Sequence, residues 1–321
     1  MSLLKDPPPA YAFEVSEAGI AVAEIARQPK ISFAALERDV VSVSPLRDNV
    51  LRPEALLHQV RAVAAADGSR KRRRAALILP DYAVRVSVLD FDDFPADSRE
   101  QTSLVRFRLK RSVPFDVDSA ALSFHAQRDS AGGKRVDVTA AVAPLEIVAR
   151  YEAPFRLAGF HIGWVTTSSL AALELVPHTG LTVLAKLTGR VLNLAVLNDG
   201  VLKLIRSIEL SDCTAQEIAG HLFPTFAYIE DQFSATPDTL LVCGFGAATQ
   251  ESGDTPGSLR WTSRSPEVAG VSPGFLDSSE RTRAWLESEL GVRAVPLTSR
   301  FGQPGELNAG LLGYLEMLKE A

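Results

Sequence analysis

The clearest pattern of apolar and polar positions runs from residue 181 to residue 210, LTVLAKLTGRVLNLAVLNDGVLKLIRSIEL. An apolar run at 181–185 leads into a polar turn that begins at Lys186, and an alternating run at 191–197 leads into Asp199-Gly200 and a further run. An Asp-Gly pair between alternating runs indicates a β-hairpin, because the turn needs positive φ angles that Gly and Asp adopt at low cost. The stretch therefore predicts a meander of three strands.

A similar order of elements occurs at the start of the chain. Residues 13–45 predict a meander that turns near Gly19, Pro53 stands at the first position of a predicted helix, and strands are expected at 75–79 and 84–91. The second half repeats this order of meander, helix and strand. The duplication of a ββ(β)αβα unit resembles the actin-like (ribonuclease H-like) α/β fold, in which two lobes face each other across a nucleotide cleft.

The pattern changes between the two repeats. A charged, amphipathic helix over 97–111 ends before Pro114, and two alternating runs flank a Gly-rich hairpin turn at 130–133. We predict four parts. They are a first lobe at 1–93, an inserted small α+β subdomain at 94–143, a return to the first lobe with a connection at 144–178, and a second lobe at 179–321.

Composition limits the classes of function. A hydrophobic content of 46% with 23% charged residues is typical of a globular protein, and a net charge of −5 argues against nucleic acid as a partner. The basic run at 70–74 is either a solvated loop or a contact with an acidic membrane surface. Residues 249–277 are rich in Ser, Pro, Gly and Thr, which predicts a long surface excursion whose role the sequence leaves open.

The sequence also lacks several patterns that would indicate secretion, membrane insertion or metal binding. Charged residues and prolines near the N-terminus argue against a secretory signal, and no apolar run is long enough to span a membrane. Two cysteines thirty positions apart suggest no disulfide framework, so we expect a cytoplasmic protein. The five histidines lack the spacing of metal ligands, and no hydrolase or P-loop motif is present.

Three stretches carry a more specific resemblance. They are AALILPDYAVRVSVLDFDDFP with the following VRFRLKRSVPF and DSAALSFHA, then AVAPLEIVARYEAPFRLAGFHIGWVTTSSLAALEL, and finally LNAGLLGYLE. Together they resemble the type IV pilus assembly protein PilM family, which is related to the cell-division protein FtsA. Related secretion-system proteins of the same fold are the alternative. The likeness covers most of the chain in order, although each stretch alone is a weak signal.

The resemblance also indicates where a nucleotide would bind. In active members each lobe has an Asp-Ile-Gly turn followed by small hydroxyl residues, where the carboxylate serves magnesium and the backbone amides cradle phosphate. Here the first turn falls on Glu14 to Glu17, the second begins at Lys186, and the adenosine-side Gly-Gly falls on Gly244-Phe245. The degenerate cleft is thus assigned to Glu14, Ser16, Lys186, Thr188, Gly189, Gly244 and Gly246.

These departures favour a pseudo-ATPase with a structural cleft over an enzyme, and no cofactor is expected. Glu17 adds a negative charge where phosphate oxygens should lie, and a phenylalanine at 245 would compete with the purine for space. One hypothesis is that Lys186 forms a salt bridge with Glu14 or Glu17 and fills the phosphate site with protein charge. The alternative is a functional actin-like ATPase that binds Mg-ATP in the cleft.

The resemblance implies a cytoplasmic scaffold on the inner face of the inner membrane. Such a scaffold would bind the short N-terminal cytoplasmic tail of a PilN-like bitopic membrane protein, and it would reach the membrane peripherally through that partner. The tail would lie as an extended peptide in a groove between the first lobe and the inserted subdomain. Candidate groove residues are Phe107, Leu109, Phe115 and Phe124. The alternative for each is that it belongs to the core of the subdomain.

Overall fold

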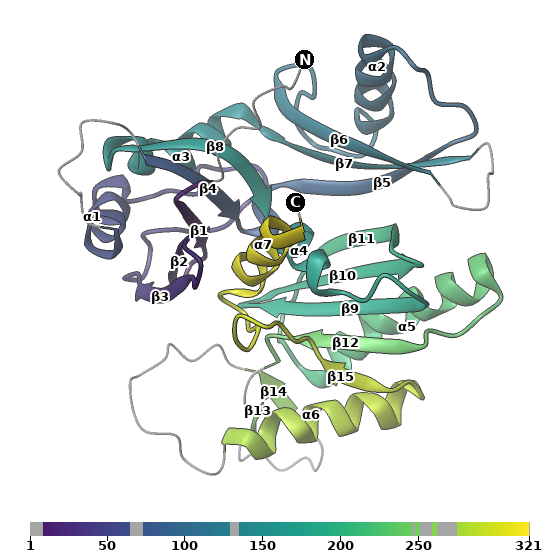
Figure 1. The fold of residues 1–321 in the computed structure, drawn as a ribbon. Helices are drawn as coiled ribbons and strands as arrows, with labels where there is room; N and C mark the ends of the chain where they lie inside the picture. Colours follow the sequence, from purple (N-terminus) through teal and green to yellow (C-terminus); the bar gives the residue numbers. More distant parts are fainter. Residues whose placement is uncertain are drawn as a thin grey trace.

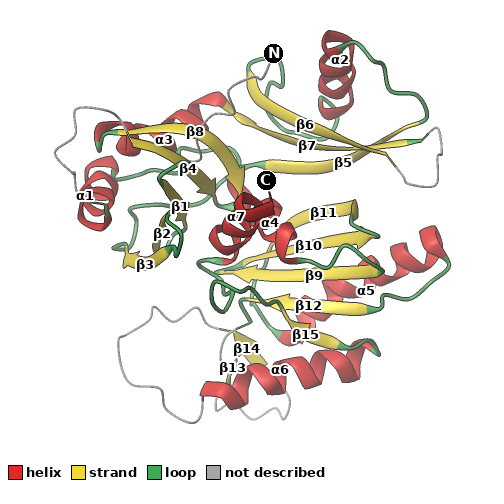
Figure 2. Ribbon diagram, in the orientation of Figure 1, coloured by secondary structure: helices red, strands yellow, loops and turns green. Residues whose placement is uncertain are grey.

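The structure, a computed structural model, describes residues 9–64, 73–128, 135–245, 248–250, 259–261 and 275–320. Two five-stranded sheets lie in separate lobes, and a three-stranded sheet packs beside them (Figures 1 and 2). Most of the predicted excursion at 249–277 and the first part of the basic run at 70–74 lie outside the described residues. Two short strands fall within the excursion, β13 (Ala248–Gln250) and β14 (Leu259–Trp261), and they pair with each other.

The first lobe is built on a sheet of strand order β3-β2-β1-β4-β8. Its strands are β1 (Tyr11–Val15), β2 (Gly19–Glu24), β3 (Lys30–Ala35), β4 (Arg73–Leu79) and β8 (Phe160–Thr167). The meander strands pair antiparallel, whereas β4 pairs parallel with both β1 and β8. Two helices, α1 (Pro53–Val63) and α3 (Leu145–Leu157), contribute to the apolar core on one face of this sheet.

The second lobe repeats this arrangement with the strand order β11-β10-β9-β12-β15. Its strands are β9 (Leu181–Thr188), β10 (Val191–Asn198), β11 (Val201–Glu209), β12 (Thr239–Cys243) and β15 (Ala294–Pro296). The pairing directions match those of the first sheet, and α5 (Ala215–Phe233) and α6 (Phe275–Leu290) pack on one face. The predicted duplication is therefore confirmed.

Local sequence signals explain two features of the second lobe. Asp199 and Gly200 have φ angles of 48° and 78°, as the predicted Asp-Gly turn between β10 and β11 requires. Thr214 caps α5 by accepting a hydrogen bond from the N–H of Glu217, and the Glu217 carboxylate accepts bonds from the N–H groups of residues 211–213. Burial alone would raise the pKa of Glu217, but these hydrogen bonds and one from the Ser211 hydroxyl lower it to about 2.

The inserted subdomain contains one strand more than expected. It consists of β5 (Arg85–Phe91), α2 (Ser98–Leu109), β6 (Ala120–Arg128) and β7 (Val136–Pro144), with β7 between β5 and β6. The sequence pattern places β5 within the first lobe, ahead of a boundary at 93/94, whereas in the structure β5 pairs along its whole length with β7. We call this four-element unit the module below.

Two helices fill the space between the lobes (Figure 1). They are α4 (Ser168–Ala172), which leads into the short 3₁₀ turn η2 (Leu173–Leu175), and the C-terminal helix α7 (Ala309–Glu320). Apolar side chains of α7 cover the face of the first sheet that α1 and α3 leave open, while α4 contributes to the core under the second sheet. A further 3₁₀ turn, η1 (Asp81–Ala83), directly follows the end of β4 and Pro80.

Candidate functional site

Polar side chains, five of them buried and two half-buried, gather where β1, β4, β8 and β9 end between the lobes. We call this group the interlobe polar cluster. It consists of Glu14, Asp81, Ser168, Ser169, Lys186, Thr188 and Glu306. The carboxyl ends of parallel strands in an open α/β sheet are the usual place for a ligand site, so this cluster marks the position of the predicted nucleotide cleft.

Lys186 joins the two lobes through Asp81. Its ammonium lies 3.0 Å from Oδ2 of Asp81 and 2.8 Å from Oγ1 of Thr188, and its side chain is 0% exposed. The hypothesis of a salt bridge to Glu14 or Glu17 was therefore wrong about the partner. Lys186 lies within β9, where it pairs with Asn193 and Cys243, and not in the turn after it. The carboxylate of Asp81 compensates the buried charge there.

Each of the two buried carboxylates receives hydrogen bonds from a helix in the interlobe layer. Oδ1 of Asp81 accepts a bond of 2.6 Å from the N–H of Ser169 in α4, and Oε2 of Glu14 accepts one of 2.7 Å from the N–H of Leu311 in α7. The hydroxyl of Ser168 also donates to Oε1 of Glu14. The first turn of a helix favours negative charge, so both carboxylates stabilise the helices that separate the lobes.

Burial and charge act in opposite directions on these groups. Burial alone would lower the pKa of Lys186, but the charges of Asp81 and Glu14 outweigh it and raise that pKa, so Lys186 remains protonated. Burial raises the pKa of Glu14 in spite of Lys186 and of the hydrogen bonds from Ser168 and Leu311. The charged form of Lys186 is thus stabilised at the junction of the lobes by its ion pair with Asp81.

The two hairpin turns that were predicted to face phosphate already have protein partners. In the first turn the Ser16 hydroxyl bonds within the turn itself, at 3.1 Å from both the N–H and the carbonyl oxygen of Gly19. In the second, the N–H of Gly189 points to a carboxylate oxygen of Glu306 at 3.4 Å. These contacts do not fit a magnesium–phosphate group. The Glu306 carboxylate lies at the turn N–H to which a phosphate oxygen would bind, and the ammonium of Lys186 is already paired with Asp81.

The adenosine side of the predicted nucleotide cleft differs from the sequence-based expectation in the position of one side chain. Gly244 has a φ of +79°, and a Cβ there would clash with the backbone of Leu187, so a glycine is required for close packing. The Phe245 side chain belongs to the apolar core of the second lobe and does not point into the cleft, contrary to its expected competition with a purine. Gly246 lies outside the described residues.

The four candidate groove residues do not form one surface. Leu109 is 0% exposed in the core of the module, so it cannot contact a partner in this conformation. Phe124 packs on the same core against the ring of Phe94. Phe107 is 60% exposed on α2, with the Arg111 guanidinium over its ring, and Phe115 is half-buried at the edge of the core.

Phe115 alone of these four lines a cavity of 180 Å³ where the module meets the first lobe. We call this cavity the junction groove. Its lining residues are Pro45, Tyr82, Val84, Arg85, Val86, Ser112, Pro114, Phe115 and Ser207. The first lobe, the module and the second lobe all contribute to it, and most of its walls are apolar.

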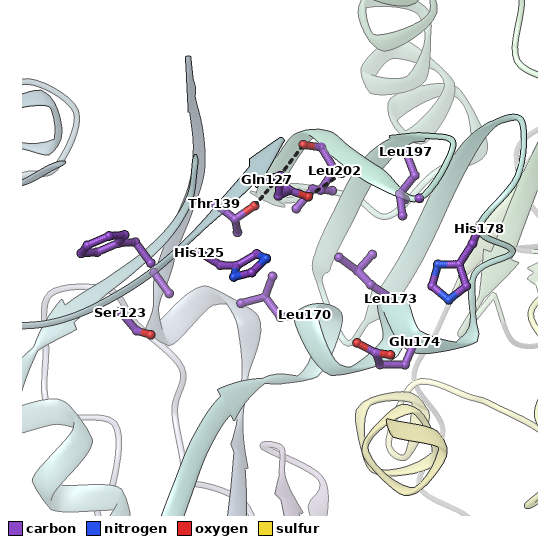
Figure 3. A pocket seen from close by; sticks show the side chains of 13 residues that line it. Ser123, His125, Gln127, Thr139, Leu170, Leu173, Glu174, His178, Leu197 and Leu202 are labelled. Carbon is purple, nitrogen blue, oxygen red and sulfur yellow. Dashed lines mark hydrogen bonds between the residues drawn. The ribbon is translucent and has the colours of Figure 1, made fainter. Parts of the chain in front are cut away.

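A second cavity, of 310 Å³, lies between the module and the second lobe (Figure 3). The polar face of β6 and β7 forms one wall, with the His125 imidazole beside Leu170, and residues of α4, η2 and the β10–β11 hairpin form the other. The amide of Gln127 crosses at one end to the backbone of Leu202.

The sequence analysis missed several residues of the interlobe polar cluster. Asp81 directly follows a buried strand and Pro80, and Ser168 and Ser169 directly follow β8. A polar residue just after an apolar strand is a usable signal in a parallel sheet, since such ends meet in space. Glu306 lies in a loop and gives no comparable signal.

Comparison with solved structures identifies this architecture. A chain of a PilM-PilN type IV pilus biogenesis complex superposes with a TM-score of 0.71, covering 96% of this chain and 98% of that one. The fold is actin-like. At 15% sequence identity the likeness concerns the fold. No protein-family model and no curated protein sequence matches the chain.

Other matches are more distant. The cytoplasmic domain of EpsL, an inner-membrane component of the Vibrio cholerae type II secretion system, matches with a TM-score of 0.46 and 14% identity over 72% of this chain and 80% of that one. A Bacteroides thetaiotaomicron protein with an actin-like ATPase fold and unknown function matches with a TM-score of 0.47 and 10% identity over 89% of each chain. Every helix in the described part of this actin-like chain is too short or too polar to cross a bilayer.

Proposed function

We propose that the protein is a cytoplasmic scaffold of a type IV pilus or related secretion machine, located at the inner face of the inner membrane. Its partner would be the short N-terminal tail of a PilN-like bitopic membrane protein. The observation that carries this proposal is the junction groove, an apolar cavity between the first lobe and the module, in a chain whose fold is that of a protein from a PilM-PilN complex.

The chemistry of the junction groove supports an extended peptide as its occupant. Tyr82 and Phe115 offer aromatic walls to apolar side chains of the tail. The hydroxyl groups of Ser112 and Ser207 donate to Leu109 and Asn193, so only their oxygens can accept hydrogen bonds from the N–H groups of the tail. The strand β5 is an edge strand of its sheet and contributes Arg85 and Val86 to the groove.

The groove proposal predicts that aromatic side chains determine tail affinity. Phe115→Asp should weaken binding of a synthetic N-terminal tail, taken from the PilN-like protein of the same organism, by about tenfold or more. Tyr82→Ala, at a second lining residue, should do likewise without altering the core of the module. Fluorescence anisotropy with a labelled peptide measures both. Phe107→Asp is the matched control, since Phe107 is exposed on α2, and binding equal to wild type by both groove variants would refute the assignment.

We further propose that the scaffold works without nucleotide and is a pseudo-ATPase. The support is the interlobe polar cluster, in which Lys186 and Glu306 supply both signs of charge that a magnesium–nucleotide complex would bring. The protein would then hold its lobes together by its own ion pair, and no hydrolysis step is required for partner binding.

Calorimetric titration with Mg-ATP tests this second proposal. We expect no saturable heat up to about 1 mM nucleotide, which corresponds to binding weaker than about −4 kcal/mol. A dissociation constant in the micromolar range, or phosphate release above the rate of a blank, would favour the alternative of a functional actin-like ATPase.

A further inference from the structure

We infer that a latch between the module and the second lobe sets the geometry of the junction groove. The latch consists of Gln127 and Asp137 on the module and of Leu202 and Lys203 on the second lobe. This inference rests on the proposed tail-binding function and concerns how that site is assembled.

Gln127 binds the second lobe in the manner of a neighbouring strand. Its Oε1 accepts a hydrogen bond of 2.9 Å from the N–H of Leu202, and its Nε2 donates to the carbonyl oxygen of the same residue at 3.1 Å (Figure 3). Nε2 also donates to Oγ1 of Thr139 at 2.9 Å, which fixes the orientation of the amide. A single side chain thus satisfies both backbone groups of Leu202.

The strand β11 has a β-bulge at this contact. It is the edge strand of its sheet, and its register against β10 shifts between Val196 and Leu197, which pair with Leu204 and Leu202. Lys203 is therefore the extra residue of a β-bulge. Bulges redirect side chains at sheet edges, and here the bulge coincides with the residue that reaches the module.

An ion pair stands next to the amide contact. Nζ of Lys203 lies 2.8 Å from Oδ2 of Asp137, and the two side chains are only 14% and 19% exposed. Asp137 is the cross-strand neighbour of Gln127 in the module sheet. Two adjacent positions on the module therefore hold two consecutive residues of the second lobe, an arrangement that fixes orientation as well as distance.

The latch and the junction groove share strand β11. Ser207 of β11 and Val86 of β5 both line the groove, and β11 lies along β5 without pairing to it (Figure 1). Since the latch holds the start of β11 against the module, release of the latch would separate Ser207 from the module side of the groove. Gln127, Asp137 and Lys203 are thus positioning residues for the groove and do not line it.

The test measures the distance between the module and the second lobe and the affinity for the tail peptide. Spin labels at Ser103→Cys on α2 and Asp231→Cys on α5 report the separation of module and second lobe, and the native Cys213 and Cys243 are buried. In a Gln127→Ala/Lys203→Ala variant we expect a longer and broader distance distribution. If the module is docked in only a tenth of the molecules, affinity for the synthetic PilN-like tail falls about tenfold.

Two further variants make the result specific. The charge swap Asp137→Lys/Lys203→Asp should keep both the narrow distance distribution and the affinity of the wild type, and Lys110→Ala, which removes an ion pair within the module, should change neither. Unchanged distances in the Gln127→Ala/Lys203→Ala variant, or altered distances with unchanged affinity, would overturn the inference. A wild-type protein that does not bind the peptide would refute the proposed function instead, and the distances alone would then decide the latch.

Discussion

Replacement of Lys186 by methionine should lower the free energy of unfolding by about 3–5 kcal/mol, because removal of one partner leaves a buried charge without compensation. Asp81 would retain its bonds to Ser169 but lose the ammonium at 3.0 Å, and Glu14 would lose the opposite charge nearest to it. Chemical denaturation monitored by circular dichroism measures the loss.

Two variants separate this effect from a general loss of charge. Lys110→Met removes an ion pair whose side chains are 48% and 60% exposed, and such pairs contribute about 0.5 kcal/mol or less. The double variant Lys186→Met/Asp81→Asn should recover part of the stability, since it removes the uncompensated charge. A Lys186→Met variant as stable as Lys110→Met would show that the interlobe ion pair contributes little.

Alanine at Gly313 should destabilise the protein by about 2 kcal/mol, because the added methyl group would overpack a contact between two backbones. A Cβ at Gly313 would lie 2.9 Å from Cα of Ala172 and would clash with the carbonyl group of Ala171, so α7 would have to move away from α4. Gly310 makes a similar approach to Ser168, at 2.7 Å from its Cα.

The same substitution at a different helix supplies the control. Gly220 lies in α5 with nothing within 4 Å of an added Cβ, so Gly220→Ala should stabilise the protein by up to about 1 kcal/mol through helix propensity alone. Thermal unfolding of the two variants should therefore shift the melting temperature in opposite directions. A rise for Gly313→Ala would mean that the two helices are not tightly packed.

Regular local patterns predicted most of the fold. Alternation of apolar residues and the Asp199-Gly200 turn placed the second meander, and the repeat of this pattern indicated the duplicated lobes. The sheet to which β5 belongs was not predictable in this way, because alternation shows that a strand has two different faces but not which strand pairs with it.

The candidate site was predictable in position but not in its contacts. The hairpin turns led to Glu14 and Lys186, yet the bond that joins the lobes runs to Asp81, which is 105 positions from Lys186. In α2, Phe107 and Leu109 are similarly apolar, and only the packing of the module distinguishes the exposed ring from the buried side chain. Long-range partners of this kind depend on tertiary structure, which one sequence does not encode locally.

The bond between Glu14 and Leu311 spans 297 positions of the chain. Apolar residues of α7 also cover β1, β2 and β4, so one face of the first sheet is completed only by residues near the end of the sequence. During synthesis on the ribosome, that face therefore stays exposed until α7 has emerged. Contacts between distant segments form slowly, and exposed sheet surface promotes aggregation. The first lobe is consequently translated early and completed late, which gives chaperones a defined surface to protect in the interval.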